Sequence, residues 1–182
     1  MTSTPDATET KFRIRNLYKI FGPKPEFALR ELLDNNLNKT ELLEKHNHAL
    51  ALKNINLEAK AGDITVIMGL SGSGKSTLIR HVNRLIEPTS GEIIFEGKDI
   101  LRCSPDELRA IRREKMSMVF QNFGLLPHRT VIENAGLALE ARGISRREKF
   151  SEAEKWLDEV GLQGYGDQYP NQLSGGMRQR VG

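Results

Sequence analysis

The sequence predicts an α/β fold with a largely parallel sheet, and three observations support that prediction. Short apolar runs alternate along the chain with segments whose apolar residues follow a helical period. Two of the runs, ITVIM at 64–68 and MSMVF at 116–120, carry no charge, as strands covered on both faces do. Glycine and proline mark the turns between the segments. The length of 182 residues predicts one domain, with two small domains as the alternative.

The individual elements follow from these patterns. Strands are predicted where apolar and polar residues alternate, or where a short run is apolar throughout. These strands are residues 12–18, 50–58, 64–68, 92–96 and 116–120. Helices are predicted where apolar residues recur at helical spacing. These helices are residues 78–86, 105–113 (with Ser104 as cap and Pro105 first), 131–141 and 146–160 (ended by Gly161).

Two segments stand outside this alternation. Residues 1–10 are polar, and we expect them to form a disordered lead-in. In the segment 24–48 the leucines fall near helical spacing, and Thr40 precedes a leucine pair as a helix N-cap does. The sequence therefore predicts a helical insertion of one or two short helices between the first two strands.

The composition excludes several classes of protein. The chain is 38% hydrophobic and 28% charged, and its formal net charge of +3 is too small to indicate a nucleic-acid-binding surface. The densest basic stretch, 109–115, is interpreted as a solvated helix face. No run approaches the ~18 apolar residues that span a bilayer, and the N-terminus lacks the apolar core of a secretory signal. The single cysteine, Cys103, excludes an internal disulfide and fits a reducing cytosol.

The strongest chemical signal is GLSGSGKS at 69–76, which satisfies the pattern G-x-x-x-x-G-K-[ST] in full. Its glycines let backbone N–H groups turn towards an anion, and the following helix adds its positive N-terminal end. Lys75 supplies charge for the β- and γ-phosphates, Ser76 a hydroxyl for Mg²⁺, and Thr77 another for the phosphates. The alternative is a glycine-rich turn with no ligand. The residues predicted to bind the nucleotide, called the phosphate loop below, are Gly69, Leu70, Ser71, Gly72, Ser73, Gly74, Lys75, Ser76 and Thr77.

A second anion-binding element is predicted at LSGGMRQR, residues 173–180. Ser174 is suited to cap a helix, and Gly175 and Gly176 leave backbone amides uncovered at its start. The element has no lysine of its own and lies about a hundred residues from the phosphate loop. Two phosphate-seeking sites in one small domain suggest that one of them serves a nucleotide held by a different subunit.

The two motifs together resemble the Walker A and signature motifs of the ABC ATPases, and MSMVFQ resembles the strand and glutamine of their Q-loop. The resemblance covers the chain from about residue 12 to its end. It implies a P-loop NTPase fold with an incomplete parallel sheet, an antiparallel β subdomain and a helical subdomain at 122–172. It also implies ATP and Mg²⁺ as cofactors, and a head-to-tail homodimer. The signature segment that would complete the partner's ATP site is Leu173, Ser174, Gly175, Gly176 and Met177.

The resemblance also assigns roles to single residues. Gln121 matches the Q-loop glutamine, which reaches Mg²⁺ and the attacking water, so Ser76 and Gln121 are the implied metal ligands. Phe21, in KIFG, matches the aromatic residue that stacks on adenine. Tyr18 is the alternative for that role, and a core position is the alternative for Phe21. Arg178 and Arg180 could add positive field at the signature segment, or serve surface solubility.

Longer stretches resemble one branch of the family, the glycine betaine/proline importer ATPases. These are NLYKIFG, VIMGLSGSGKST, NRLIEPTSGEI, MVFQNFGLLPHRTVIEN and the insertion at 24–48. The resemblance implies an ATPase subunit that couples ATP binding and hydrolysis to osmolyte uptake. It would lie on the cytoplasmic side of the cell membrane, bound to a transmembrane permease and indirectly to a solute-binding protein. No nucleic-acid partner is expected, because the long insertions of nucleic-acid or ribosome ABC ATPases do not occur in the sequence.

The chain departs from the family pattern after the signature. The Walker B strand with its aspartate, the adjacent glutamate, the D-loop and the switch histidine are not present, so 11–182 is expected to be a partial nucleotide-binding domain. We therefore expect the front portion of a longer product, with negligible ATP hydrolysis by itself and no general base. The alternatives are a catalytically inactive nucleotide-binding remnant and an ABC ATPase of another solute importer.

Overall fold

The computed structural model describes residues 10–182. The chain divides into a first unit, Met1–Leu108, and a second unit, Arg109–Gly182. The predicted lead-in at 1–10 lies outside the described residues except for Thr10, which is already part of a strand. Among the helices of the described residues, none has the length and apolar character that a membrane crossing requires.

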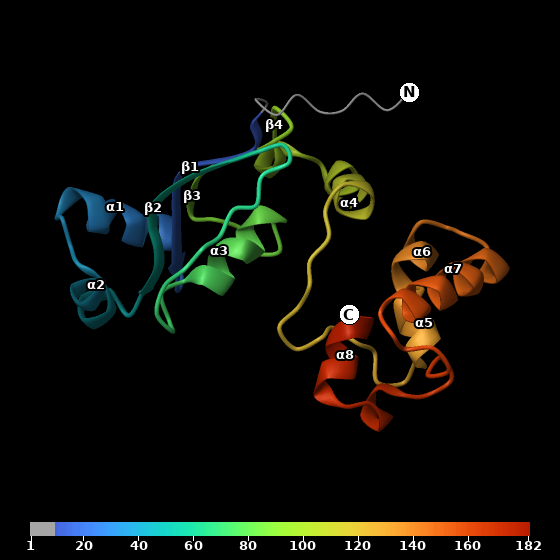
Figure 1. The fold of residues 1–182 in the computed structure, drawn as a ribbon. Coiled ribbons are helices and arrows are strands. Elements are labelled where there is room, and N and C mark those ends of the chain that lie inside the picture. The colour runs from blue at the N-terminus through green and yellow to red at the C-terminus, as the bar shows by residue number, and fades with distance from the viewer. Residues whose placement is uncertain (1–9) are drawn as a thin grey trace. The chain divides into compact units, whose positions relative to one another are not determined.

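The first unit is built on a four-stranded antiparallel sheet with the order β2-β1-β3-β4 (Figure 1). Its strands are β1 (Thr10–Phe21), β2 (Ala49–Lys60), β3 (Ser90–Phe95) and β4 (Lys98–Asp99). The strands predicted at 12–18, 50–58 and 92–96 are therefore confirmed. In β1 the buried face changes after Ile14, because Asn16 is in the left-handed region (φ 47°) and the register shifts before Leu17.

The predicted helical insertion is confirmed as α1 (Pro25–Asp34) and α2 (Lys39–His46), drawn in blue and teal beside the sheet in Figure 1. Its buried face joins that of the sheet in one apolar cluster, made of Ile20, Ala28, Leu32, Leu37, Leu42 and Leu50. The prediction of Thr40 as N-cap is wrong. Asn38 caps α2, since its Oδ1 accepts from the N–H groups of Thr40 and Glu41 at 2.9 Å each. Glu41 in turn accepts from the N–H of Asn38 at 2.8 Å, which completes a capping box.

The two apolar runs at 64–68 and 116–120 do not form strands, and this prediction is wrong. Both lie outside the hydrogen-bonded ladders of the described residues. Ile64 and Met68 are 92% and 86% exposed, and Val119 is 77% exposed. A strand exists only where a neighbour accepts and donates its backbone hydrogen bonds, and the strands of the first unit pair with one another instead. The α/β class is confirmed, but within residues 10–182 the sheet is antiparallel.

The remaining elements of the first unit follow the phosphate loop. Helix α3 (Lys75–Val82) begins three residues before the predicted helix at 78–86 and ends at a turn where Arg84 has φ 52°. A short 3₁₀ turn, η1 (Ile100–Arg102), leads to α4 (Pro105–Glu114). The boundary between the two units, after Leu108, falls within α4. The predicted cap of α4 is confirmed, because Ser104 Oγ accepts from the N–H of Glu107 at 3.3 Å.

The second unit is helical around one apolar cluster, Val131, Leu157, Leu162 and Leu173. Its elements are α5 (Val131–Ala135), α6 (Leu137–Ala141), α7 (Arg146–Glu159), the 3₁₀ turn η2 (Pro170–Gln172) and α8 (Gly175–Val181). The helix predicted at 131–141 is two helices, since the chain turns at Gly136, against which Lys149 packs: a Cβ there would lie 2.8 Å from Lys149 Cγ. The predicted end of α7 is confirmed by Gly161, with φ 69°.

Candidate nucleotide site

The phosphate loop is a turn that only glycine accommodates at two of its positions. Gly72 and Gly74 have φ angles of 76° and 95°, which side chains rarely adopt. Between them, the N–H of Ser73 donates to the carbonyl of Leu70 at 3.2 Å. The loop thereby curls in front of the first turn of α3, as the sequence predicts.

Gly74 also lets the loop lie close against strand β2 of the sheet. A Cβ at this position would lie 2.8 Å from the carbonyl oxygen of Ala51 and 3.1 Å from Leu52 Cδ2, both on β2. Any side chain would therefore push the loop away from the sheet. Gly69 is crowded from within the loop, because a Cβ there would lie 2.7 Å from Ser73 Oγ.

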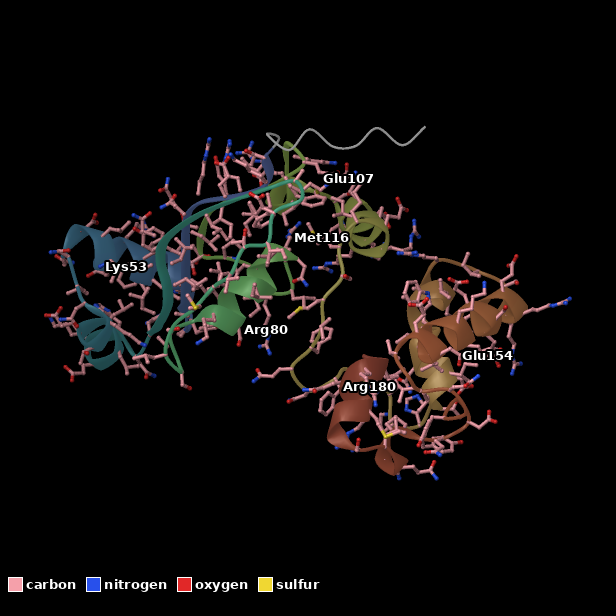
Figure 2. All side chains as sticks on the ribbon, viewed as in Figure 1. Lys53, Arg80, Glu107, Met116, Glu154 and Arg180 are labelled. Atoms are coloured by element: carbon pink, nitrogen blue, oxygen red, sulfur yellow. The ribbon has the colours of Figure 1, made fainter. Side chains whose placement is uncertain are left out.

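Lys75 folds back over the loop that it follows. Its Nζ donates to the carbonyl oxygens of Gly69 and Leu70 at 2.8 Å each, and lies 3.5 Å from Ser73 Oγ. The ammonium is thus held at the loop by neutral acceptors, which a phosphate oxygen would replace with a stronger, charge-assisted partner. Figure 2 shows the side chains of this region, with Arg80 marking α3.

The first turn of α3 is open to an anion. Its N-cap, Gly74, makes no side-chain cap, and the turn contains no acidic residue. Ser76 is exposed there, and Thr77 is half-buried. The next turn is anchored by His81, which is fully buried and whose Nδ1 lies 2.7 Å from the carbonyl oxygen of Thr77. Burial lowers the pKa of His81, so the ring is neutral at pH 7.

Phe21 ends β1 at the same end of the sheet as the phosphate loop. It pairs with Ala49, and Lys19 pairs with Leu52, the residue that Gly74 contacts. Phe21 is 42% exposed, whereas Tyr18 is half-buried against the apolar cluster of the insertion. The stacking role stays a prediction, and the exposure favours Phe21 over Tyr18.

The signature segment lies in the second unit and opens α8. Ser174 caps the helix as predicted, its Oγ accepting from the N–H of Met177 at 3.3 Å. Leu173 is buried in the cluster of the second unit, and Met177 packs against that cluster, so both anchor the segment. A Cβ at Gly175 or Gly176 would meet nothing within 4 Å, so among the described residues no packing demands these glycines. The backbone of Gly175 and Gly176 is therefore exposed.

Gln121 lies in the second unit as well. It is exposed and lines a cavity of about 350 Å³ together with Val119, Phe120, Phe123, Gln179 and Gly182. The structure therefore brings Gln121 to the helix of the signature segment, through Gln179. Ser76, the other predicted metal ligand, belongs to the first unit.

Three residues that contact the predicted site residues or their helix could not be predicted from the sequence. Gln179 shares the cavity of Gln121, His81 anchors α3, and the Nζ of Lys19 lies over the ring of Phe21. No motif marks any of them, because each contact depends on how the chain is folded. Only for Lys19 does its place two residues before Phe21 give a weak signal.

These features define the class of protein. A glycine-rich loop that opens a helix, with a lysine folded over it, is the phosphate-binding device of P-loop nucleotide-binding domains. The chain belongs to the ABC transporter family, since the model of that family matches residues 52–182.

Similar proteins agree with the family. The chain is 49% identical over 172 residues to the glycine betaine/proline betaine transport system ATP-binding protein ProV of Escherichia coli, covering 94% of this chain and 43% of that protein. It is 49% identical over 173 residues to the glycine betaine/carnitine transport ATP-binding protein GbuA of Listeria monocytogenes, covering 95% and 43%. A dimeric, post-hydrolysis structure of the ATP-binding cassette MJ0796, bound to ADP and Pi, superposes with a TM-score of 0.75 at 33% identity, over 93% of this chain and 66% of that one. The chain thus spans less than half the length of these two curated relatives.

Proposed function

We propose that this chain is the nucleotide-binding part of an ATP-binding subunit of an ABC importer for glycine betaine and similar quaternary amines. The observation that carries the proposal is the lysine-closed phosphate loop, within a chain that matches a betaine transport protein over 94% of its length. That match includes most of the insertion at 24–48. Coupling of ATP binding and hydrolysis to uptake follows from the family.

The loop residues suit ATP with Mg²⁺. Lys75 and the amides of the first turn of α3 would hold the phosphates. The exposed hydroxyl of Ser76 is a hard oxygen donor of the kind that Mg²⁺ takes beside phosphate oxygens. The amide oxygen of Gln121 is a donor of the same kind, and we propose it as the second protein ligand and as the residue that positions water.

The uncovered glycines of the signature segment support a second copy of the chain as partner. Gly175 and Gly176 leave room at the start of α8 for a γ-phosphate held by that copy, in a head-to-tail homodimer. A transmembrane permease, a solute-binding protein behind it, and a peripheral position on the cytoplasmic side of the membrane complete the proposal. Negligible ATP hydrolysis by this chain alone stays a prediction.

Uptake of labelled glycine betaine tests the proposal in cells that carry the gene. At raised osmolarity, Lys75→Ala is expected to abolish uptake, whereas Lys53→Ala, an exposed lysine of β2 labelled in Figure 2, leaves it unchanged. Uptake that survives Lys75→Ala, or that is absent in the unmodified cells while another solute is carried, would contradict the proposed function.

A further inference from the structure

Lys19 joins the end of β1 to the turn before β3. Its Nζ donates to the carbonyl oxygen of Glu87 at 2.8 Å and lies 4.9 Å from the centroid of the Phe21 ring. A cation within about 6 Å of an aromatic centroid is attracted by the electron-rich face of the ring. The ammonium is therefore shared between a fixed acceptor and one face of Phe21.

The turn that holds Lys19 is itself fixed to β1. The N–H of Thr89 donates to the carbonyl of Tyr18 at 2.8 Å, and the N–H of Ile20 donates to Thr89 Oγ1 at 3.0 Å. Glu87 is held from the other side by Arg84, whose Nε donates to its carboxylate at 2.7 Å. The carbonyl oxygen of Glu87 thus has a defined position, and its hydrogen bond fixes the position of the Lys19 ammonium.

The same group lies beside the phosphate loop. Leu52 pairs with Lys19 across the β1–β2 ladder, and its side chain is the one that Gly74 approaches. Phe21, two residues further along β1, is exposed and lies at the same end of the sheet as the phosphate loop.

We propose that Lys19 is a positioning residue for the nucleotide base: it holds the Phe21 ring from one face so that the other face receives the adenine. This inference rests on the proposed function, and on Phe21 as the ring that contacts the base. The lysine contributes in two ways. It fixes the orientation of a side chain that is 42% exposed, and its charge draws electron density from the ring, which favours stacking against an electron-rich purine.

Calorimetric titration with two ligands separates this role from a general effect on the loop. ATP contains the base, whereas inorganic tripolyphosphate contains only the phosphate chain. Lys19→Met keeps most of the aliphatic stem but removes the charge and the bond to Glu87. It is expected to weaken ATP binding about three- to fivefold and to leave tripolyphosphate binding unchanged. Lys19→Arg keeps a cation over the ring and is expected to restore ATP binding.

Lys11→Met is the matched control. The Nζ of Lys11 lies 5.6 Å from the ring centroid of Phe95, so this variant also removes a lysine from an aromatic face, but at the other end of β1. It is expected to bind both ligands as the unmodified chain does. Melting curves of all variants check that each is folded.

Each other result overturns the proposal. If Lys19→Met leaves the affinity for ATP unchanged, Lys19 does not position the Phe21 ring for the base. If the affinity rises, Lys19 covers the face of the Phe21 ring that the base would need. If both ligands weaken equally, Lys19 supports the loop. Failure of the proposed function itself looks different, because the unmodified chain would then bind neither ATP nor tripolyphosphate.

Discussion

Gly74 and Lys75, adjacent in the chain, contribute to the site in opposite ways. Gly74 serves by having no side chain, because the carbonyl of Ala51 and the side chain of Leu52 occupy the space that a Cβ would need. Lys75 is proposed to serve by its charge, and the loop holds its ammonium through two carbonyl oxygens, which a bound phosphate would replace. The phosphate loop therefore depends on close packing at one residue and on electrostatics at the next.

Gly74→Ala is predicted to weaken ATP binding more than tenfold, because the loop must leave β2 to make room for the methyl group. Gly62→Ala is the matched control. Gly62 has a similar φ of 81°, but a Cβ there would meet nothing within 4 Å, so it carries the backbone strain of about 1–2 kcal/mol without the crowding. Titration of both variants with ATP measures the difference. Equal affinities would show that the contact with β2 does not hold the loop.

The buried ring of His81 predicts a pH dependence of stability. Burial lowers its pKa below the ordinary 6.5, so near and below that pH the unfolded chain binds a proton that the folded chain does not. The neutral, buried His81 ring therefore contributes fully to the free energy of unfolding above pH 6.5, and this contribution is lost as the pH falls below that value. The midpoint of thermal unfolding is expected to drop between about pH 7.5 and pH 5.5. The drop should be smaller in His81→Asn, whose amide can donate to the carbonyl of Thr77 but does not titrate. Parallel pH profiles of the two proteins would contradict a neutral, buried His81.

At the scale of elements, the helix ends depend on single hydrogen-bonding side chains. Asn38 begins α2 and Ser174 begins α8, and each accepts from amides that the helix leaves without partners. In the insertion this matters because α2 has only eight residues and one buried leucine, Leu42, to hold it.

Asn38→Ala is accordingly predicted to lower the free energy of unfolding by about 1 kcal/mol, through loss of the capping box. Thr40→Ala, the cap that the sequence favoured, is expected to change it by less than about 0.5 kcal/mol. Urea unfolding of the two variants decides between them, and a larger loss for Thr40→Ala would disprove the assignment.

The strands show what local pattern can and cannot predict. The strands at 12–18, 50–58 and 92–96 could be predicted, because alternation is local and their partners lie in the same unit. The runs at 64–68 and 116–120 show only that a strand there would be apolar on both faces, not that a neighbour is present to pair with it. Similarly, the fixed spacing of the phosphate loop predicts its residues, whereas the place of Lys19 over Phe21 depends on the pairing of β1 with the turn before β3.

On the scale of the whole molecule, the two predicted anion-binding elements belong to different units of the chain. The phosphate loop lies in the first unit and the signature segment in the second. In the first, the glycines are required by backbone conformation and by contact with β2. In the second, Gly175 and Gly176 are surrounded by open space. A glycine that its own unit does not require is explained if a partner approaches it.

Gly176→Val therefore tests the partner without disturbing the fold. Since a Cβ there meets nothing within 4 Å, the melting temperature is expected to change little. The side chain would nevertheless stand where the γ-phosphate of the second copy is proposed to bind. Analytical ultracentrifugation is expected to show an ATP-dependent dimer of the unmodified chain and a monomer of the variant. An ATP-dependent dimer of Gly176→Val would contradict the head-to-tail arrangement.

Calorimetric titration of the chain with ATP and Mg²⁺ measures whether the phosphate loop with Lys75 binds ATP. The unmodified chain is predicted to bind one ATP, and Lys75→Ala to weaken that binding about tenfold or more, because a charge-assisted contact with the phosphates is lost. Lys53→Ala serves as the control for removal of a surface charge. Absence of binding to the unmodified chain, or equal binding by Lys75→Ala, would contradict ATP binding at the phosphate loop.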